Sequence, residues 1–277
     1  MTQRQDTGHS AGEAGLADPT DERSNCGVGV VMDLDGGKAN WVVQEGLDLV
    51  ECMEHRGTTG AESNTGDGAG IMFQIPHEFF EEEVDTDLPA PGEYAIGSLF
   101  LPQDESAKAD LKDLVETKLA EEDLDVLAWR DVPTDNSTLG DTAVESEPDV
   151  QQVFVTSAED KTGKDFDRQL YVGRRVLENH VEDAQPPGHE RFYIVSLDKD
   201  TVVYKGLLLA EQVPEYYPEL RDERMISTFA MVHARFSTNT LGAWHLAHPY
   251  RNIIHNGEFN TIQGNINWMR ARQTDIA

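Results

Sequence analysis

The feature that most constrains this chain is a cysteine placed directly before a short run of alternating glycine and valine. Cys26 is followed by the run GVGVVM at 27–32. The alternation predicts a strand with Val28, Val30 and Met32 on one face and glycines on the other. Glycines on a strand allow another backbone or a ligand to come close. The run therefore predicts a strand that carries a thiol at its start.

Two blocks more than two hundred residues later supply an arginine and an Asn-Gly pair. Arg235 lies in HARFST at 233–238, and Asn256-Gly257 lies in HNGE at 255–258. A thiol, a cation and a pair of amide donors are the groups needed to attack a carboxamide, hold a carboxylate and stabilise an oxyanion. Each also has an ordinary interpretation: Cys26 as a small buried hydrophobic residue, Arg235 as a salt-bridge partner, and Asn256-Gly257 as a hairpin turn.

The charge of the chain restricts its partners. Asp and Glu total 52 against 22 Lys and Arg, for a net charge of -30. Such a chain is unsuited to nucleic-acid phosphates or an anionic membrane, which both require basic surfaces. The acidic residues are spread along the whole sequence, which is typical of the carboxylate-rich surface of a halophile protein. In salt of about 1 M the Debye length is about 3 Å, so we expect strong screening there and self-repulsion in dilute buffer.

Cysteine usage and the first residues indicate a cytoplasmic protein. The two cysteines, Cys26 and Cys52, do not form a disulfide scaffold and favour a reducing compartment. Residues 1–25 are polar and acidic and do not resemble a signal peptide, so we expect a disordered leader. The sequence has no run of about 18 apolar residues that could cross a membrane.

Hydrophobic periodicity predicts helices and strands without the regular alternation of a doubly wound sheet. One helix is expected to begin at an Asn40 cap and to end at Arg56-Gly57. A second helix, with Leu111 and Leu119 on its apolar face, is expected to begin at a Ser106 cap. A third helix is expected over 166–179. Strands are expected at 26–32, 71–76, 94–101, 126–132, 152–156, 192–197, 202–204, 230–234 and 251–255. A glycine-rich loop is expected over 57–70.

An ordered series of blocks identifies a resemblance between Asn25 and Arg272. The blocks lie at 26–29, 55–57, 65–71, 129–130 with 132–133, 152–155, 170–172 with 174–175, 203–206, 233–240 and 255–270. In this order they resemble the N-terminal, class II (N-terminal-nucleophile) glutamine amidotransferase domain of the glutamate synthase large subunit. The stretch 251–270 distinguishes glutamate synthase from other class II amidotransferases.

The resemblance implies an α+β fold, a four-layer αββα sandwich, over residues 26–277. It also implies that residues 1–25 are a propeptide, cut between Asn25 and Cys26. The α-amine of Cys26 would then act as the local base, because an α-amine has a pKa of about 7.7–8.0. The thiolate would attack the carboxamide of glutamine, giving a γ-glutamyl thioester and ammonia, and water would release glutamate.

The resemblance assigns roles to the remaining site residues. Arg235 would hold the glutamine α-carboxylate through its planar fork, and Thr238 and Asn239 on the same loop would add hydrogen bonds. Asn256 and Gly257 would form the oxyanion hole from a side-chain amide and a backbone N–H. A metal site at His245, His248 and His255 is disfavoured, because the sequence there has no cysteine and no closely spaced helical histidine pair. A phosphate site in the glycine-rich loop is disfavoured too, because the loop lacks a Gly-Lys-Ser/Thr ending.

The sequence departs from the family in its extent. The acidic residue that would bind the substrate α-amine, the remaining strands of the domain and the synthase domains with FMN and an iron-sulfur cluster are not present, so no cofactor is expected in this chain. We expect a truncated or split form whose partners are L-glutamine and the remaining synthase domains or subunits. Its function is then glutamine hydrolysis that supplies ammonia for 2-oxoglutarate. The alternatives are a non-catalytic fragment that only associates with those domains, and a thiol hydrolase of another amide.

Overall fold

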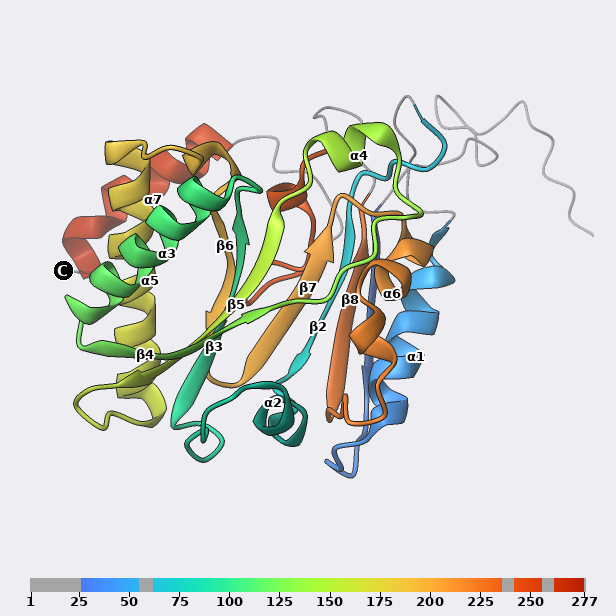
Figure 1. The fold of residues 1–277 in the computed structure, drawn as a ribbon, viewed down its shortest axis with the longest axis horizontal. Coiled ribbons are helices and arrows are strands. Elements are labelled where there is room, and N and C mark those ends of the chain that lie inside the picture. The colour runs from blue at the N-terminus through green and yellow to red at the C-terminus, as the bar shows by residue number, and fades with distance from the viewer. Residues whose placement is uncertain (1–25, 55–61, 236–241, 256–261, 277) are drawn as a thin grey trace, which may run out of the picture.

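The computed structural model describes residues 26–54, 62–235, 242–255 and 262–276 (Figure 1). Its strands are β1 (Gly27–Met32), β2 (Ala69–Gln74), β3 (Tyr94–Leu101), β4 (Leu124–Asp131), β5 (Asp149–Ser157), β6 (Tyr193–Asp198), β7 (Thr201–Gly206) and β8 (Phe229–Ala234). Its α-helices are α1 (Asn40–Glu51), α2 (His77–Glu83), α3 (Glu105–Ala120), α4 (Asp141–Glu145), α5 (Gly163–Ala184), α6 (Val213–Tyr216) and α7 (Ile262–Ile276). Short 3-10 helices span 189–191, 210–212, 218–221 and 244–246.

The strands of the described residues form two four-stranded sheets. The first sheet has the order β1-β8-β2-β7 and the second the order β4-β5-β3-β6. All of their pairings are antiparallel. The expected α+β class with antiparallel sheets is therefore confirmed.

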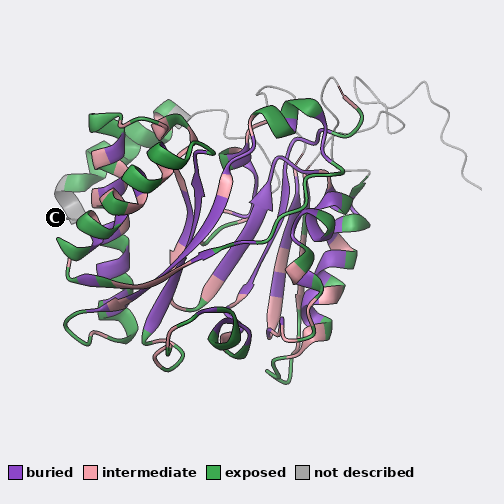
Figure 2. Ribbon diagram, viewed as in Figure 1, coloured by how far each residue is buried: buried purple, intermediate pink, exposed green. Residues whose placement is uncertain are grey.

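Two long helices cover the second sheet because each carries an apolar stripe at helical spacing. Leu111, Val115 and Leu119 of α3 and Phe166 and Leu170 of α5 are all buried. They pack in one cluster with buried side chains of the second sheet. Figures 1 and 2 show the two helices side by side along this sheet, with buried residues facing the strands and exposed ones facing solvent.

The first sheet is covered by α1, and glycines of β1 make the close packing possible. A Cβ at Gly27 would lie 2.7 Å from the sulfur of Met53, just after α1, and one at Gly29 would clash with Leu49. The prediction that these glycines allow close approach is thus explained by a helix and not by a ligand. On the helix side, a Cβ at Gly46 would lie 2.7 Å from the Cβ of Ala230 in β8.

Two predicted helix caps are wrong, for different reasons. Asn40 is the first residue of α1 and its side-chain amide donates to the carbonyls of Asp222 and Met225, both at 2.9 Å, so tertiary contacts take the group that would cap. Asp104, not Ser106, caps α3 by accepting from the N–H of Ala107 at 2.9 Å.

Several predicted boundaries also differ from the structure. α1 ends at Glu51, before the expected Arg56-Gly57, which lies outside the described residues. The expected strand over 251–255 is wrong: Tyr250 and Ile253 form one isolated bridge around a turn. The strand expected from Ile71 begins at Ala69. Helices α2, α4, α6 and α7 were not expected. No helix among the described stretches is both long and apolar enough to cross a lipid bilayer.

The charge of the protein predicts a strong effect of salt on stability. A net charge of -30 repels itself more in the compact state than in the unfolded chain. We expect an increase in KCl from about 0.1 M to about 2 M to raise the free energy of unfolding by about 2 kcal/mol. This corresponds to a rise in Tm of about 4–8 °C. Thermal unfolding followed by circular dichroism measures this, with sucrose of equal osmolality as the uncharged control. A Tm that does not respond to KCl, or that responds equally to sucrose, contradicts the expectation.

Candidate active site

Strand pairing brings Cys26 and Arg235 together from opposite ends of the chain. In the antiparallel pair β1–β8, Gly27 lies opposite Ala234 and Val28 opposite His233. Continued by one residue, this register places Cys26 opposite Arg235 at the end of the sheet. Because paired residues share a face, both side chains belong to the face of His233. Both residues are partly exposed.

The end of the glycine-rich loop holds the backbone of Arg235. The N–H of Arg235 donates to the carbonyl of Gly68 at 2.8 Å, and its guanidinium reaches the carbonyl of Asp67 at 3.4 Å. Gly68 has a φ of +131°, a conformation that other L-residues rarely adopt. The side chain of Gln212 fixes the start of this loop by donating to the carbonyl of Asn64 at 3.0 Å. The loop thus aligns Arg235 beside the end of β1.

The other predicted site residues cannot be placed. Thr238 and Asn239, expected to contact substrate, and Asn256 and Gly257, expected to form the oxyanion hole, lie outside the described residues. The expected leader, 1–25, lies outside them too. Cys52 is exposed just after α1, although its position on an amphipathic helix predicts a core residue; neither cysteine forms a disulfide.

A group of three histidines, of which His233 and His248 are buried, lies next to Arg235, and His233 is two residues before it on β8. His233 is fully buried, and its Nε2 lies 3.0 Å from the carbonyl oxygen of His255. Because a carbonyl only accepts, this Nε2 carries the proton. The ring of His248 stacks on His233 at 4.4 Å and meets the ring of His255 edge-on at 4.8 Å. In the described part of the chain no three His, Cys, Asp or Glu residues are arranged to hold a metal ion.

Burial sets the protonation of these histidines. It lowers the pKa of His233 to about 4 and that of His248 to about 3, and neighbouring cations act in the same direction. Both rings are therefore neutral near pH 7. Lys205 of β7 is also fully buried. It belongs to the sequence block 203–206, which predicted no role for it in the site.

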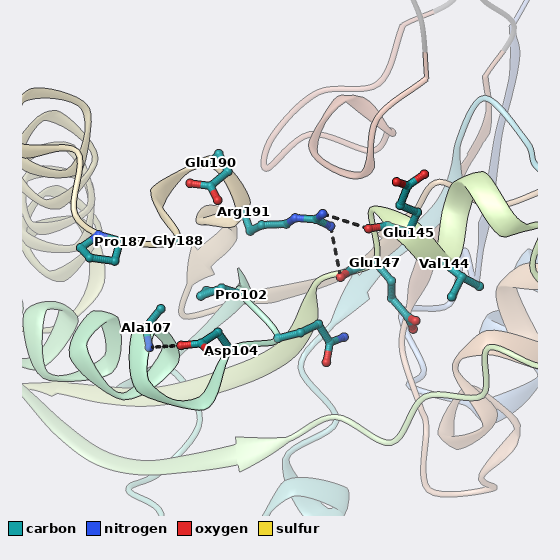
Figure 3. A pocket seen from close by; sticks show the side chains of 11 residues that line it. Pro102, Asp104, Ala107, Val144, Glu145, Glu147, Pro187, Gly188, Glu190 and Arg191 are labelled. Atoms are coloured by element: carbon teal, nitrogen blue, oxygen red, sulfur yellow. Dashed lines mark hydrogen bonds between the residues drawn. The ribbon is translucent and has the colours of Figure 1, made fainter.

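Cavities of the described structure lie away from Cys26 and Arg235. One of about 450 Å³ lies between the start of α3, the end of α4 and the 187–191 turn, and four of its eleven lining residues are acidic (Figure 3). There Arg191 donates to the carbonyls of Glu145 and Glu147, at 2.9 and 3.4 Å. Neither Cys26 nor Arg235 lines this cavity. Cys26 and Arg235 are therefore chosen as the candidate site because of their chemistry, and not because they line a cavity.

Comparison of the sequence with known families shows to which group of proteins this chain belongs. The profile of the family described as "Glutamine amidotransferases class-II" matches residues 26–277, and so begins at Cys26. This chain belongs to the class II glutamine amidotransferases. The family resemblance expected from the ordered blocks is confirmed.

Relatives of this class II amidotransferase chain are glutamate synthases. It is 42% identical over 261 residues to "Glutamate synthase [NADPH] large chain" of Bacillus subtilis (strain 168), covering 94% of this chain and 17% of that protein. It is 41% identical over 266 residues to "Ferredoxin-dependent glutamate synthase 1, chloroplastic/mitochondrial" of Arabidopsis thaliana, covering 95% of this chain and 16% of that protein. The chain thus spans about one sixth of the length of these curated relatives.

The buried histidine of this amidotransferase predicts a loss of stability in acid. His233 is neutral when folded, with a pKa of about 4, but protonates near pH 6.5 when unfolded. Its contribution is therefore complete above pH 6.5 and is lost as the pH falls from 6.5 toward 4. As the pH falls from 7 to about 4.5, we expect the free energy of unfolding of wild type to fall by about 2–3 kcal/mol more than that of His233→Gln. This variant keeps an N–H donor. Urea unfolding at the two pH values measures this difference. Equal losses in the two proteins contradict the expectation.

Proposed function

We propose that this chain is the glutaminase portion of a glutamate synthase, which hydrolyses L-glutamine to glutamate and ammonia. The observation that carries the proposal is the β1–β8 register, which sets a thiol and a guanidinium opposite each other at one end of a sheet. The family match that begins at Cys26 supports it. A nucleophile beside a carboxylate-binding cation is the arrangement that hydrolysis of an amino-acid amide requires.

The proposed reaction begins with removal of residues 1–25, which makes Cys26 the first residue. Its α-amine takes the thiol proton, and the sulfur attacks the side-chain carbonyl of glutamine. Asn256 and Gly257 stabilise the oxyanion, and the tetrahedral intermediate collapses to a thioester with loss of ammonia. Water then attacks the thioester, giving glutamate and restoring the thiol. Arg235 holds the α-carboxylate throughout, with Thr238 and Asn239 adding hydrogen bonds.

The ammonia has a proposed destination outside this chain. We propose that it is transferred to 2-oxoglutarate in the remaining synthase domains or subunits, which would carry the FMN and the iron-sulfur cluster. The high acidic charge supports a cytoplasm of high salt as the location. These assignments rest on the glutamate synthase relatives, of which the chain covers 16–17%.

The edge strand of the first sheet is suited to pairing with a further segment of polypeptide chain. β1 is an edge strand, and its Val28, Val30 and Met32 are 36%, 46% and 52% exposed. An apolar edge strand of this kind favours pairing with another segment. We propose that the complete domain is a four-layer αββα sandwich whose first sheet continues beyond β1. The same edge favours the second candidate, a non-catalytic fragment that acts only by associating with the other synthase domains.

Substitution of Arg235 tests the glutamine assignment. Loss of a charged hydrogen-bonding partner costs about 1.5–3 kcal/mol, so Arg235→Ala is expected to raise the KM for glutamine about 10- to 150-fold. The value of kcat should change little, because the carboxylate is held equally in substrate and transition state. Arg224→Ala is the matched control, since this partly exposed arginine forms ion pairs with Glu82, Glu83 and Asp222. Steady-state release of glutamate measures both constants.

Four outcomes separate the candidate functions and test the role of Arg235. Hydrolysis of glutamine but not of asparagine, with the shift in KM confined to Arg235→Ala, supports the glutaminase. Equal turnover of both amides favours a thiol hydrolase of broader range. Wild-type KM in Arg235→Ala removes the role proposed for this residue, and an inactive wild-type chain that still binds its synthase partner favours the non-catalytic fragment.

A further inference from the structure

The side-chain nitrogen of Lys205 is held by main-chain carbonyls in the interior of the protein. Lys205 lies on β7 and is fully buried. Its Nζ donates to the carbonyl of Ala247 at 2.7 Å and to that of His245 at 3.1 Å. The rings of Tyr250 and Tyr193 lie 4.7 and 4.9 Å from the same nitrogen. The side chain thus ties β7 to the segment 245–248, which begins within the 3-10 helix at 244–246.

Placing a lysine in this interior position costs folding free energy that an apolar side chain would not. Burying a cation without a carboxylate carries a desolvation penalty of several kcal/mol. Burial lowers the pKa of Lys205 well below its ordinary value, and the charge of Arg251 lowers it further; no acidic residue of the described chain offsets this. An uncharged amine keeps two N–H groups, one for each carbonyl. Lys205 therefore supplies two specific hydrogen bonds in place of simple packing.

The segment that Lys205 holds is packed against the loop that holds Arg235. A Cβ at Gly68 would lie only 2.8 Å from the Cβ of Ala247, so Ala247 packs closely against Gly68. The carbonyl of Gly68 accepts the N–H of Arg235 at 2.8 Å. A continuous series of contacts thus runs from Lys205 through Ala247 and Gly68 to Arg235. A shift of Ala247 moves the carbonyl on which the Arg235 backbone depends.

We infer that Lys205 is a positioning residue for Arg235: it fixes the segment 245–248 against the 67–68 loop, and so sets the guanidinium at the distance from Cys26 that glutamine requires. This role rests on the proposed glutaminase function. Lys205 itself touches no reacting atom, so its loss should weaken recognition of the substrate carboxylate and leave the reactivity of the thiol in place.

Hydrogen exchange tests the physical coupling without reference to catalysis. The variant is Lys205→Met, which keeps the length of the side chain and removes its N–H donors. The matched control is Tyr204→Phe, because Tyr204 is the preceding residue of β7, is fully buried and also loses a buried hydrogen bond. In Lys205→Met we expect the peptide that contains the Arg235 amide to exchange about tenfold faster or more, and in Tyr204→Phe to exchange as in wild type. If Lys205→Met does not fold, Lys205→Gln, with a shorter donor, is measured in its place.

Covalent labelling of Cys26 tests the consequence for the site. A diazoketone analogue of glutamine needs its α-carboxylate bound, whereas iodoacetamide needs only an accessible thiolate. We expect Lys205→Met to lower the labelling efficiency of the glutamine analogue about tenfold, through weaker binding, and to change the iodoacetamide rate by less than about twofold. Tyr204→Phe should change neither rate by more than that.

The results distinguish this inference from the proposed function. Wild-type exchange at Arg235 in Lys205→Met, or a parallel fall of both labelling rates, overturns the inference. Failure of the wild-type protein to react with the glutamine analogue would instead remove the proposed glutaminase. The exchange of the Arg235 amide would still decide whether Lys205 controls its position.

Discussion

Replacing Cys26 by alanine is expected to abolish glutamine hydrolysis and to leave the fold unchanged. Cys26 precedes β1 and is only partly buried, so removing its sulfur leaves no large cavity in the core. Loss of the nucleophile removes covalent catalysis altogether, and we expect a fall in kcat of about 10³-fold or more. Release of ammonia from glutamine, measured at saturating substrate, gives the size of the effect.

The second cysteine provides the control for this experiment. Cys52 is exposed just beyond α1, and Cys52→Ala should retain wild-type kcat and Tm. Circular dichroism of Cys26→Ala should match wild type, which separates lost chemistry from lost folding. Residual hydrolysis near the wild-type rate in Cys26→Ala, or a loss in Cys52→Ala, would mean that Cys26 is not the nucleophile.

Breaking the buried ion pair between Arg130 and Glu219 is expected to have the largest effect on stability. The guanidinium of Arg130 makes a two-point contact with the carboxylate of Glu219, at 2.5 and 3.2 Å, and both side chains are 6% exposed. Gln152 accepts from the same guanidinium at 2.9 Å, and the hydroxyl of Tyr204 donates to Glu219 at 2.7 Å. The group joins β4 and β5 of one sheet to β7 of the other through the 218–221 turn.

Glu219→Ala removes the buried carboxylate that pairs with Arg130 and leaves only the partly exposed Glu83, 3.6 Å from the guanidinium, as an ion-pair partner among the described residues. Such a loss costs about 3–5 kcal/mol, so we expect Tm to fall by about 6–20 °C. The double variant Arg130→Met with Glu219→Leu should recover much of this, because no charge is then left buried. Glu159→Ala is the control, since its pair with Lys161 is exposed and contributes less than about 1 kcal/mol. A Tm for Glu219→Ala equal to that of Glu159→Ala would contradict this account.

Local patterns predicted most strands and the two long helices, because alternation and helical spacing record which side chains are buried. The strands at 27–32, 94–101 and 229–234 and the stripe of α3 are of this kind. The Asn40 cap failed because its amide bonds to carbonyls about 180 residues away, which no local pattern reveals. The expected strand at 251–255 failed because apolar residues at a turn resemble those of a short strand.

The site was predictable only in part. Cys26 and Arg235 could be found from their chemistry and from the ordered blocks, and the register of β1 with β8 places them together. Lys205 and His233 could not be assigned in the same way. A lysine or histidine within a strand says nothing about whether it is buried, and both depend on carbonyls of distant segments, at 245–247 and at 255. Such long-range acceptors are visible only in the folded chain.

The intact mass of the protein, expressed and purified in high salt, tests the central claim most directly. An N-terminal nucleophile requires that Cys26 become the first residue, because its α-amine is the proposed base. We predict a mass equal to that of residues 26–277, with an N-terminal cysteine. A mass equal to that of all 277 residues would contradict this claim, because Cys26 would then have no α-amine to activate it.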